Sequence, residues 1–215
     1  MCADFWNLGK EIEMLEAAGA DLIHFDVNDG VFTPIITMGE VVLSALRGKT
    51  GLPFEVHLQI SEPARHIDSF IDAGANIIII HVEACIDLFR IVKKIKDRGV
   101  KAGLSLNPIT PLSYLEYILD ELDTVLIMTI DAGLLGQSFI PQTLEKIKNT
   151  RQMISKRGLS VDITVDGAIN KLTIPNVVKA GANILALGSS SGLFGLNADK
   201  VSILNELRQL AEENR

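Results

Sequence analysis

The sequence predicts an α/β fold, a (β/α)₈ barrel whose first strand is truncated or missing. Short runs rich in isoleucine, valine and leucine alternate with helix-like segments along the whole chain, as in parallel sheets covered by helices on both faces. An Ala-Gly-Ala joint followed by Asp or Asn recurs at residues 18–21, 73–76 and 180–183. The length of 215 residues, without a linker or low-complexity tract, predicts a single barrel domain over residues 1–215.

The predicted strands are short, apolar and followed by turn residues. They are Asp21–Phe25, Pro53–Leu58, Asn76–His81, Lys101–Leu106, Thr124–Thr129, Ser160–Val165 and Asn183–Leu187. This set is one strand short of a complete barrel, because the chain opens almost directly into a helix. Either the first strand is reduced to Met1–Ala3, or the sequence starts late.

The predicted helices fill the intervals between these strands. They are Leu8–Ala18, Gly39–Leu46, Ala64–Ala73, Ile86–Arg98, Leu112–Leu119, Gln142–Lys156, Ile174–Ala180 and Ala198–Glu213. Pro63 and Pro111 suit a first helical turn. The glycine of each Ala-Gly-Ala joint suits the left-handed position that ends a helix.

Composition and charge exclude several classes of protein. The formal charge is −7 and no basic cluster is present, which argues against a nucleic-acid surface and suits a protein that handles small molecules. No uncharged apolar run is long enough for a membrane span, and the first residues do not resemble a signal peptide. The two cysteines, Cys2 and Cys85, are expected to be reduced thiols, so we expect a cytoplasmic protein without membrane attachment.

Four polar residues at the ends of apolar runs form the candidate site: His24, Asp26, His57 and Asp166. His24 and Asp26 are two positions apart, so on a strand their side chains share one face. Two imidazoles and two carboxylates that converge at strand ends suit a divalent metal ion. They also provide groups for proton transfer.

Other polar residues have simpler interpretations. A histidine that ends an apolar strand, such as His81, is usually a hydrogen-bonded core group, and His66 is expected on an exposed helix face. Asp29 precedes Gly30 and is typical of turn chemistry.

Three glycine-containing loops are candidates for binding a phosphate group, since glycine allows backbone N–H groups to approach an anion. In a barrel of this kind, phosphate commonly binds after the last two strands. A simpler interpretation is that these glycines only form turns. The candidate residues are Gly133, Gly136, Gly167, Ala168, Gly188, Ser189 and Ser190.

Sequence blocks in consistent order resemble the ribulose-phosphate 3-epimerase family over nearly the whole chain. They include His24-Phe25-Asp26-Val27-Asn28-Asp29-Gly30, Val56-His57-Leu58, His81-Val82-Glu83-Ala84, Leu106-Asn107-Pro108-Ile109-Thr110-Pro111, Gly136-Gln137-Ser138-Phe139-Ile140-Pro141, Val165-Asp166-Gly167 and Gly188-Ser189. The resemblance implies a (β/α)₈ barrel that epimerises a ketose phosphate at carbon 3. Short patterns such as Ser191-Gly192-Leu193-Phe194 also lean toward the hexulose-phosphate branch, which is similar to allulose-6-phosphate 3-epimerase.

The resemblance also implies roles for the four candidate residues. His24, Asp26, His57 and Asp166 would hold one divalent metal ion, and Asp26 and Asp166 would act as the acid and base. Zn²⁺ is the expected ion, with Mn²⁺, Fe²⁺ and Co²⁺ as alternatives. Similarity to the family also predicts a small sugar phosphate as substrate and a homodimer or higher homo-oligomer.

The chain departs from the family pattern near the candidate site. Asn28 and Gln59 stand where the family usually has methionine, whereas Met128 matches. In the expected lid, Leu134 and Leu135 replace an aromatic residue and a glycine. These changes suggest more polar metal surroundings and an altered lid.

Two other functions remain open at this stage. A noncatalytic barrel could retain the site to bind a metal or a sugar phosphate, which the altered lid and the missing strand favour. A different enolate-forming enzyme, an isomerase or a lyase, could also use this scaffold, because fold alone does not select the reaction.

Overall fold

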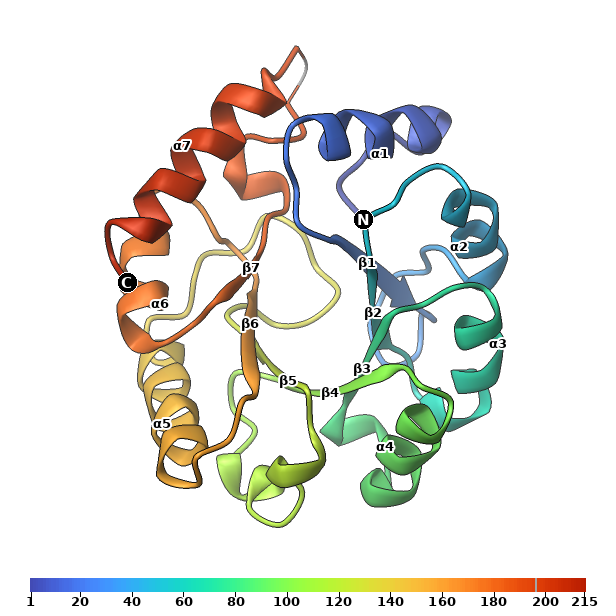
Figure 1. Cartoon of the computed structure of the whole chain (residues 1–215), viewed down its shortest axis with the longest axis vertical. Helices are drawn as coiled ribbons and strands as arrows, with labels where there is room; N and C mark the ends of the chain where they lie inside the picture. Colours follow the sequence, from blue (N-terminus) through green and yellow to red (C-terminus); the bar gives the residue numbers. More distant parts are fainter. Residues whose placement is uncertain (196) are drawn as a thin grey trace.

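The computed structural model describes residues 1–195 and 197–215, and it shows seven parallel strands in one sheet, paired in chain order. The strands form the inner wall of a ring and helices surround it, as Figure 1 shows. The strands are β1 (Ile23–Asn28), β2 (Phe54–Gln59), β3 (Ile77–His81), β4 (Lys101–Leu106), β5 (Thr124–Met128), β6 (Asp162–Asp166) and β7 (Ile184–Ala186). The predicted barrel class is therefore confirmed.

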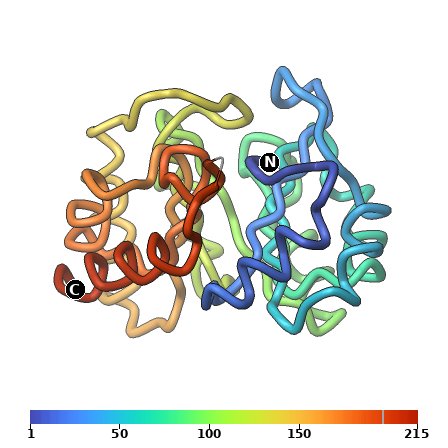
Figure 2. Tube along the Cα trace, turned by 90° about the horizontal axis from the view of Figure 1, so that it is seen from above, coloured from blue at the N-terminus to red at the C-terminus, as the bar shows by residue number. Residues whose placement is uncertain are grey.

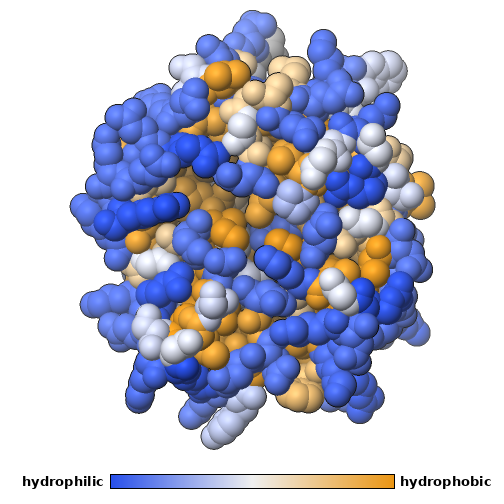
Figure 3. Space-filling view, in the orientation of Figure 1, coloured by the Kyte–Doolittle hydropathy of each residue, from blue (hydrophilic) through white to orange (hydrophobic). Residues whose placement is uncertain are grey.

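The outer layer consists of α-helices and short 3₁₀ helices, two of which lie between β4 and β5. The α-helices are α1 (Leu8–Ala17), α2 (Glu40–Arg47), α3 (Ile67–Asp72), α4 (Leu88–Asp97), α5 (Thr143–Lys156), α6 (Ile174–Ala180) and α7 (Lys200–Glu212). Polar side chains cover most of the rim in the view of Figure 3, whereas hydrophobic ones show mainly toward the middle of that face. Among the described residues, every helix is too short or too polar to cross a lipid bilayer.

The ring of strands is not closed by hydrogen bonds in the described part of the chain. Each strand pairs with its sequence neighbour, but no pairing joins β7 to β1. Residues Met1–Ala3, the expected remnant of a first strand, are not in a strand. The helical layer closes instead, because α1 packs beside α7 (Figures 1 and 2).

Strand parity divides the buried side chains into two sets. In β3, Ile78 and Ile80 belong to the large hydrophobic core shared with the helices. Ile77 and Ile79 belong to a smaller cluster with Leu126 and Met128 of β5. Because alternate residues of a strand point to opposite faces, the smaller cluster fills the interior of the barrel.

The three repeated joints behave as the sequence predicted. Gly19, Gly74 and Gly181 all have positive φ angles, of 90°, 101° and 113°. A residue with a Cβ would be strained there, so the Ala-Gly-Ala pattern marks the passage from a helix to the next strand.

Two predicted elements were wrong in detail. The predicted helix Leu112–Leu119 is instead two 3₁₀ helices, Leu112–Leu115 and Leu119–Glu121. Its buried residues Leu115 and Ile118 are three positions apart, a spacing that suits three residues per turn. The predicted helix Ala64–Ala73 is likewise divided into a 3₁₀ helix, Pro63–Arg65, and α3.

The first predicted strand, Asp21–Phe25, was also displaced. The observed β1 begins at Ile23 and continues to Asn28, because it pairs with β2 along its whole length, from Ile23 opposite Phe54 to Asn28 opposite Gln59. Asp26 therefore lies within the strand rather than at its end. Other predicted boundaries differ by one or two residues, the usual uncertainty at element ends.

Side chains in the barrel interior pack so closely around Gly103 of β4 that we expect this position to require glycine. A Cβ there would lie 2.5 Å from Thr124 Cγ2 and 2.9 Å from Ile79 Cγ1. We expect Gly103→Ala to reduce the free energy of unfolding by about 1–3 kcal/mol, because the neighbours must shift. Urea unfolding measures this change.

Gly48 provides the matched control, because a Cβ at that position would meet no atom within 4 Å. Its φ of −77° is one that alanine adopts readily, so Gly48→Ala should leave stability unchanged or raise it by about 0.4–1 kcal/mol. Equal stability of Gly103→Ala and the original chain would contradict the packing argument.

Candidate metal centre and active site

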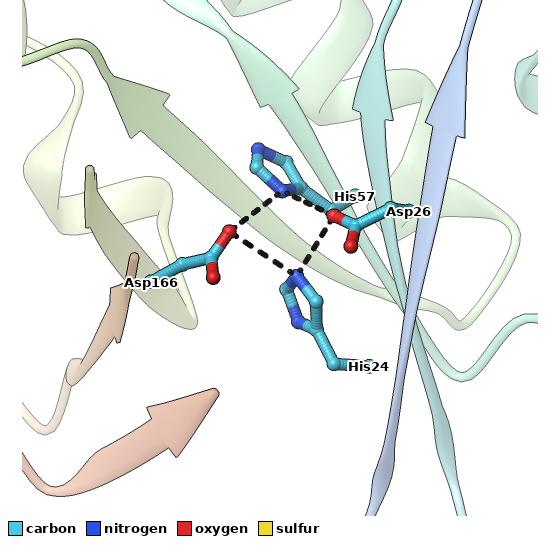
Figure 4. A group of neighbouring side chains, drawn as sticks. All are labelled: His24, Asp26, His57 and Asp166. Carbon is cyan, nitrogen blue, oxygen red and sulfur yellow. Dashed lines mark hydrogen bonds and ion pairs between the residues drawn. The ribbon is translucent and has the colours of Figure 1, made fainter. Parts of the chain in front are cut away.

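The structure brings His24, Asp26, His57 and Asp166 together inside the barrel (Figure 4). Their candidate ligand atoms all lie within 4.8 Å of one another. Asp26 Oδ1 is 3.3 Å from both His24 Nε2 and His57 Nδ1. Asp166 Oδ2 is 3.9 Å from His24 Nε2 and 3.8 Å from His57 Nδ1. The four residues predicted from sequence therefore form one cluster.

The strand arrangement explains this convergence. In the β1–β2 pair, Asp26 lies opposite His57 and His24 lies opposite Glu55. Alternate residues of both strands therefore point to the barrel interior. Asp166 is the last residue of β6, and its side chain faces those of β1 and β2 across the barrel interior. The site lies on the side of the barrel where β1 and β7 do not pair with each other in the described residues.

The charges of this cluster are strongly coupled. Burial disfavours a charge on His24, but the facing Asp26, Glu55 and Asp166 raise the pKa of that imidazole well above its usual range. Burial likewise opposes ionisation of Asp26, but His24 and His57 lower the pKa of this carboxyl well below its usual range. Burial, then the charge of Asp26, raises the pKa of Asp166. The cluster thus stabilises positive charge between its carboxylates.

The same residues fit a divalent cation. His24 Nε2 is buried without a hydrogen-bond partner, although two carboxylate oxygens are close to it. Burial lowers the pKa of His57 to about 3, so its imidazole is neutral, as a metal ligand requires. A tetrahedral site with bonds of about 2.1 Å has ligand atoms about 3.4 Å apart, similar to the shorter distances in this cluster.

Several neighbours that the sequence analysis did not select support the cluster. The wholly buried Glu55 accepts a hydrogen bond from His24 Nδ1 over 2.8 Å. His57 Nε2 lies 2.9 Å from His81 Nε2, and His81 Nδ1 lies 3.1 Å from Glu83 Oε2. Strand parity could have identified Glu55, since it is two residues before His57.

Gln59 is the third inward residue of β2. Its amide Nε2 donates to Asp26 Oδ1 over 2.7 Å, so it orients the carboxylate that both histidines face. Asn28 is directed elsewhere, because its Oδ1 accepts from Thr33 Oγ1 over 2.7 Å and its Nδ2 donates to Thr37 Oγ1 over 3.3 Å. The amide at position 59 therefore changes the polarity of the cluster, whereas Asn28 orders the following loop.

A cavity opens beside the cluster, and the phosphate-binding candidates line it together with His24, Asp26 and Asp166. These candidates are Gly133, Gly136, Gly167, Ala168, Gly188, Ser189 and Ser190. Ser190 Oγ donates to Ile169 O over 3.1 Å, so the loops after β6 and β7 adjoin. No lysine or arginine is among the described lining residues. An anion in this part of the cavity would therefore depend on backbone N–H groups and serine hydroxyls.

The segment from Gly133 to Gln137 forms one wall of the cavity. Gln137 Nε2 donates to Asp131 O and Leu134 O, over 2.8 and 3.0 Å. Leu134 and Leu135 both line the cavity. The segment expected to be a lid thus lines the same cavity as the cluster and contributes apolar surface to that cavity.

Asp29 fulfils the role in turn formation that its position before Gly30 predicted. Its Oδ1 accepts from the backbone N–H groups of Val31 and Phe32, each over 2.8 Å. Its Oδ2 accepts from Ser61 N over 2.7 Å and Ser61 Oγ over 2.8 Å. One carboxylate therefore joins the loop after β1 to the loop after β2.

Comparison with known proteins agrees with this architecture. The sequence profile of the ribulose-phosphate 3 epimerase family matches residues 1–192. The chain is 46% identical over 209 residues to the ribulose-phosphate 3-epimerase of Bacillus subtilis, covering 97% of this chain and 95% of that protein. The corresponding Escherichia coli K12 protein is 41% identical, covering 97% of this chain and 92% of that protein.

Solved structures share the fold at low sequence identity. A 3-hexulose-6-phosphate synthase superposes with a TM-score of 0.67 at 19% identity, covering 93% of this chain and 94% of that one. Thiamine phosphate pyrophosphorylase from Pyrococcus furiosus gives 0.63 at 17% identity, with coverages of 95% and 89%. These likenesses support the barrel fold and carry no information about the reaction.

The contacts of Asp29 predict a pH-dependent stability. Partial burial opposes its ionisation, but the hydrogen bonds from Ser61, Val31 and Phe32 lower the pKa of Asp29 to about 2. We expect Asp29→Asn to reduce the free energy of unfolding by about 1–2 kcal/mol at pH 7. Since the unfolded chain has a pKa of about 3.9, the deficit should be complete above about pH 5. It should shrink as the pH falls from about 4 toward 2.

Urea unfolding at pH 7, 4 and 3 tests this linkage. Glu13→Gln makes the same chemical change at an exposed position of α1 and should alter stability by less than about 0.5 kcal/mol at every pH. A deficit for Asp29→Asn that stays constant from pH 7 to pH 3 would argue against the role of the ionised carboxylate.

Proposed function

The chain belongs to the ribulose-phosphate 3-epimerase family, and on that basis we propose that it interconverts D-ribulose 5-phosphate and D-xylulose 5-phosphate by epimerisation at carbon 3. It is an isomerase of the kind that acts on carbohydrates. The observation that carries the proposal is the cluster of two imidazoles and two carboxylates beside the cavity.

Epimerisation beside a ketone requires one group that removes a proton and another that returns one to the opposite face of the same carbon. Asp26 and Asp166 face each other from β1 and β6. Their environments shift the pKa values in opposite directions, downward for Asp26 and upward for Asp166. One carboxylate is thus favoured as the base and one carboxylic acid as the acid. Their roles exchange when the reaction runs in reverse.

Each carboxyl group has two oxygens, so one can bind the cation while the other exchanges a proton with the substrate. Asp26 Oδ1 and Asp166 Oδ2 face the histidines. The second oxygen of each group is assigned to proton transfer, and that of Asp26, Oδ2, lies 4.0 Å from the α-amino nitrogen of Met1. His24, Asp26, His57 and Asp166 would hold a divalent cation, which would supply positive charge to stabilise negative charge that develops on the substrate oxygens. Zn²⁺ suits these ligands, with Mn²⁺, Fe²⁺ and Co²⁺ as alternatives.

The glycine-containing loops that line the cavity suit the phosphate group of the substrate. The residues assigned to it are Gly133, Gly136, Gly167, Ala168, Gly188, Ser189 and Ser190. A phosphate held there by backbone N–H groups would fix the distance of the sugar from the carboxylates. We extend the proposal to a homodimer or higher homo-oligomer in the cytoplasm, and gel filtration with light scattering measures that assembly state.

Proton transfer at carbon 3 predicts the effect of removing either carboxylate. Asp26→Asn and Asp166→Asn should each reduce kcat for ribulose 5-phosphate at least about 100-fold, because an amide does not exchange a proton with carbon. In deuterated water, the original chain should incorporate deuterium at carbon 3, and both variants should fail to do so. NMR measures incorporation and turnover together.

Asp162→Asn is the matched control. Asp162 begins β6, whereas Asp166 ends it, and it accepts from Asn183 Nδ2 outside the cluster. Its activity should stay near that of the original chain. Near-normal turnover by Asp166→Asn would refute the two-carboxylate scheme, and a chain that binds the sugar phosphate without exchange would be a noncatalytic binder.

The donor set also predicts metal dependence. Prolonged dialysis against a chelator should abolish deuterium exchange, and readdition of Zn²⁺, Mn²⁺, Fe²⁺ or Co²⁺ one at a time should identify the ion that restores it. Elemental analysis should find one equivalent of metal per chain in the active protein. Full activity of a protein shown to be metal-free would contradict this prediction.

The same assay decides between pentulose and hexulose substrates. The relatives reported above carry the ribulose-phosphate name, so we expect faster exchange with ribulose 5-phosphate than with allulose 6-phosphate. The lean toward the hexulose branch stays a prediction until both sugars have been compared.

A further inference from the structure

His81, which is buried, and Glu83, which reaches the surface, form a chain of polar groups behind the metal-binding candidate His57, and the proposed reaction does not use them. His57 Nδ1 faces Asp26 and Asp166, and its opposite nitrogen, Nε2, lies 2.9 Å from His81 Nε2. The two rings lie within 19° of parallel. His81 Nδ1 in turn lies 3.1 Å from Glu83 Oε2. Both imidazoles are wholly buried.

The direction of these hydrogen bonds follows from the proposed function, on which this inference rests. A neutral imidazole carries one proton, and a metal ligand needs a bare nitrogen. If His57 binds the cation through Nδ1, its proton is on Nε2, which then donates to His81. His81 Nε2 must be bare to accept, so the proton of His81 is on Nδ1 and is donated to the carboxylate of Glu83.

We propose that His81 and Glu83 are positioning residues that hold His57 in the tautomer with a free Nδ1, and that they thereby strengthen binding of the divalent cation. His24 is held in a comparable way without an intermediate group, since its Nδ1 meets Glu55 Oε1 directly at 2.8 Å. Each histidine of the cluster is thus connected by hydrogen bonds to a carboxyl group. His24 contacts Glu55 directly, and His57 contacts Glu83 through the imidazole of His81. Such outer hydrogen bonds fix ring orientation and raise the basicity of a ligand.

Glu83 also has a structural role, and its two oxygens separate the two tasks. Oε1 accepts from Asn107 N over 2.8 Å and from Thr110 Oγ1, so it anchors the loop after β4. Oε2 contacts His81. Thr110→Val therefore weakens the loop anchor and leaves the contact with His81 in place, which makes it a matched control.

The tautomers can be observed directly in the zinc-loaded protein. The chain has four histidines, so a two-bond ¹H–¹⁵N correlation spectrum contains few signals, and the exposed His66 can be assigned with His66→Gln. We expect His57 to carry its proton on Nε2 and His81 on Nδ1. His81 protonated on Nε2 would overturn the proposal, whatever the behaviour of the variants.

The affinity for Zn²⁺, measured by competition with a chromophoric chelator, is the second readout. His81→Leu removes the acceptor for His57 and should raise the Kd for Zn²⁺ about 10- to 100-fold. His81→Gln supplies an amide oxygen as an alternative acceptor and should restore the Kd to within about threefold of the original. Glu83→Gln should weaken Zn²⁺ binding and Thr110→Val should not.

The outcomes separate this inference from the proposed function. If the original chain binds no Zn²⁺ and exchanges no deuterium, the proposed function fails. If the original chain binds Zn²⁺ and exchanges deuterium, but folded His81→Leu keeps the original Kd for Zn²⁺, only the proposed role of His81 is refuted. An equal loss in Thr110→Val and Glu83→Gln would assign Glu83 to loop anchoring alone. If His81→Leu does not fold, the tautomers of the original chain and the comparison of His81→Gln with Glu83→Gln still decide.

Discussion

Electrostatic attraction inside the barrel determines the organisation of this site. Asp26 and Asp166 place candidate ligand oxygens within 4.8 Å of each other and of two imidazole nitrogens, largely shielded from water. Like charges this close in a medium of low dielectric constant repel strongly unless positive charge lies between them. The raised pKa of His24 and the raised pKa of Asp166 both express this constraint, because each favours a proton among the carboxylates. The cluster is stabilised by a proton or a cation among the carboxylates, and this property supports the proton transfer that we propose for it.

The barrel supports such a charged centre because its interior is asymmetric. Ile77 and Ile79 of β3 form a compact apolar cluster in the interior with Leu126 and Met128 of β5. The inward residues of β1, β2 and the end of β6 are polar and converge near the unpaired edges of β1 and β7. Burial of the apolar half stabilises the strands. This stabilisation offsets the cost of burying the charged groups of the polar half, which also depend on one another for hydrogen bonds and charge partners.

The sequence identified the four residues of the candidate site more completely than their surroundings, for physical reasons. His24, Asp26, His57 and Asp166 interrupt apolar strands, and their spacing places them at one end of a parallel barrel. Alternation along β2 contained an equally good signal for Glu55 and Gln59, because residues of the same parity as His57 must point inward. The partnership of His57 with His81 depends on the alignment of β2 and β3, where His57 lies opposite Ile79. No pattern within one strand reveals that alignment. The helix predicted at Leu112–Leu119 failed for a similar reason, since its apolar spacing also suits 3₁₀ turns.

Gln59 illustrates how a departure from the family pattern can be accommodated at such a centre. A methionine thioether donates no hydrogen bond, whereas the amide of Gln59 donates to Asp26 Oδ1 over 2.7 Å. That bond favours the ionised carboxylate, in the same direction as the effect of His24 and His57. The Oε1 atom of Gln59 is buried without a hydrogen-bond partner, and leaving an acceptor in that state has a cost in stability. Gln59 thus stabilises the negative charge of Asp26, and it leaves an unused acceptor beside the carboxyl group that we propose for proton transfer.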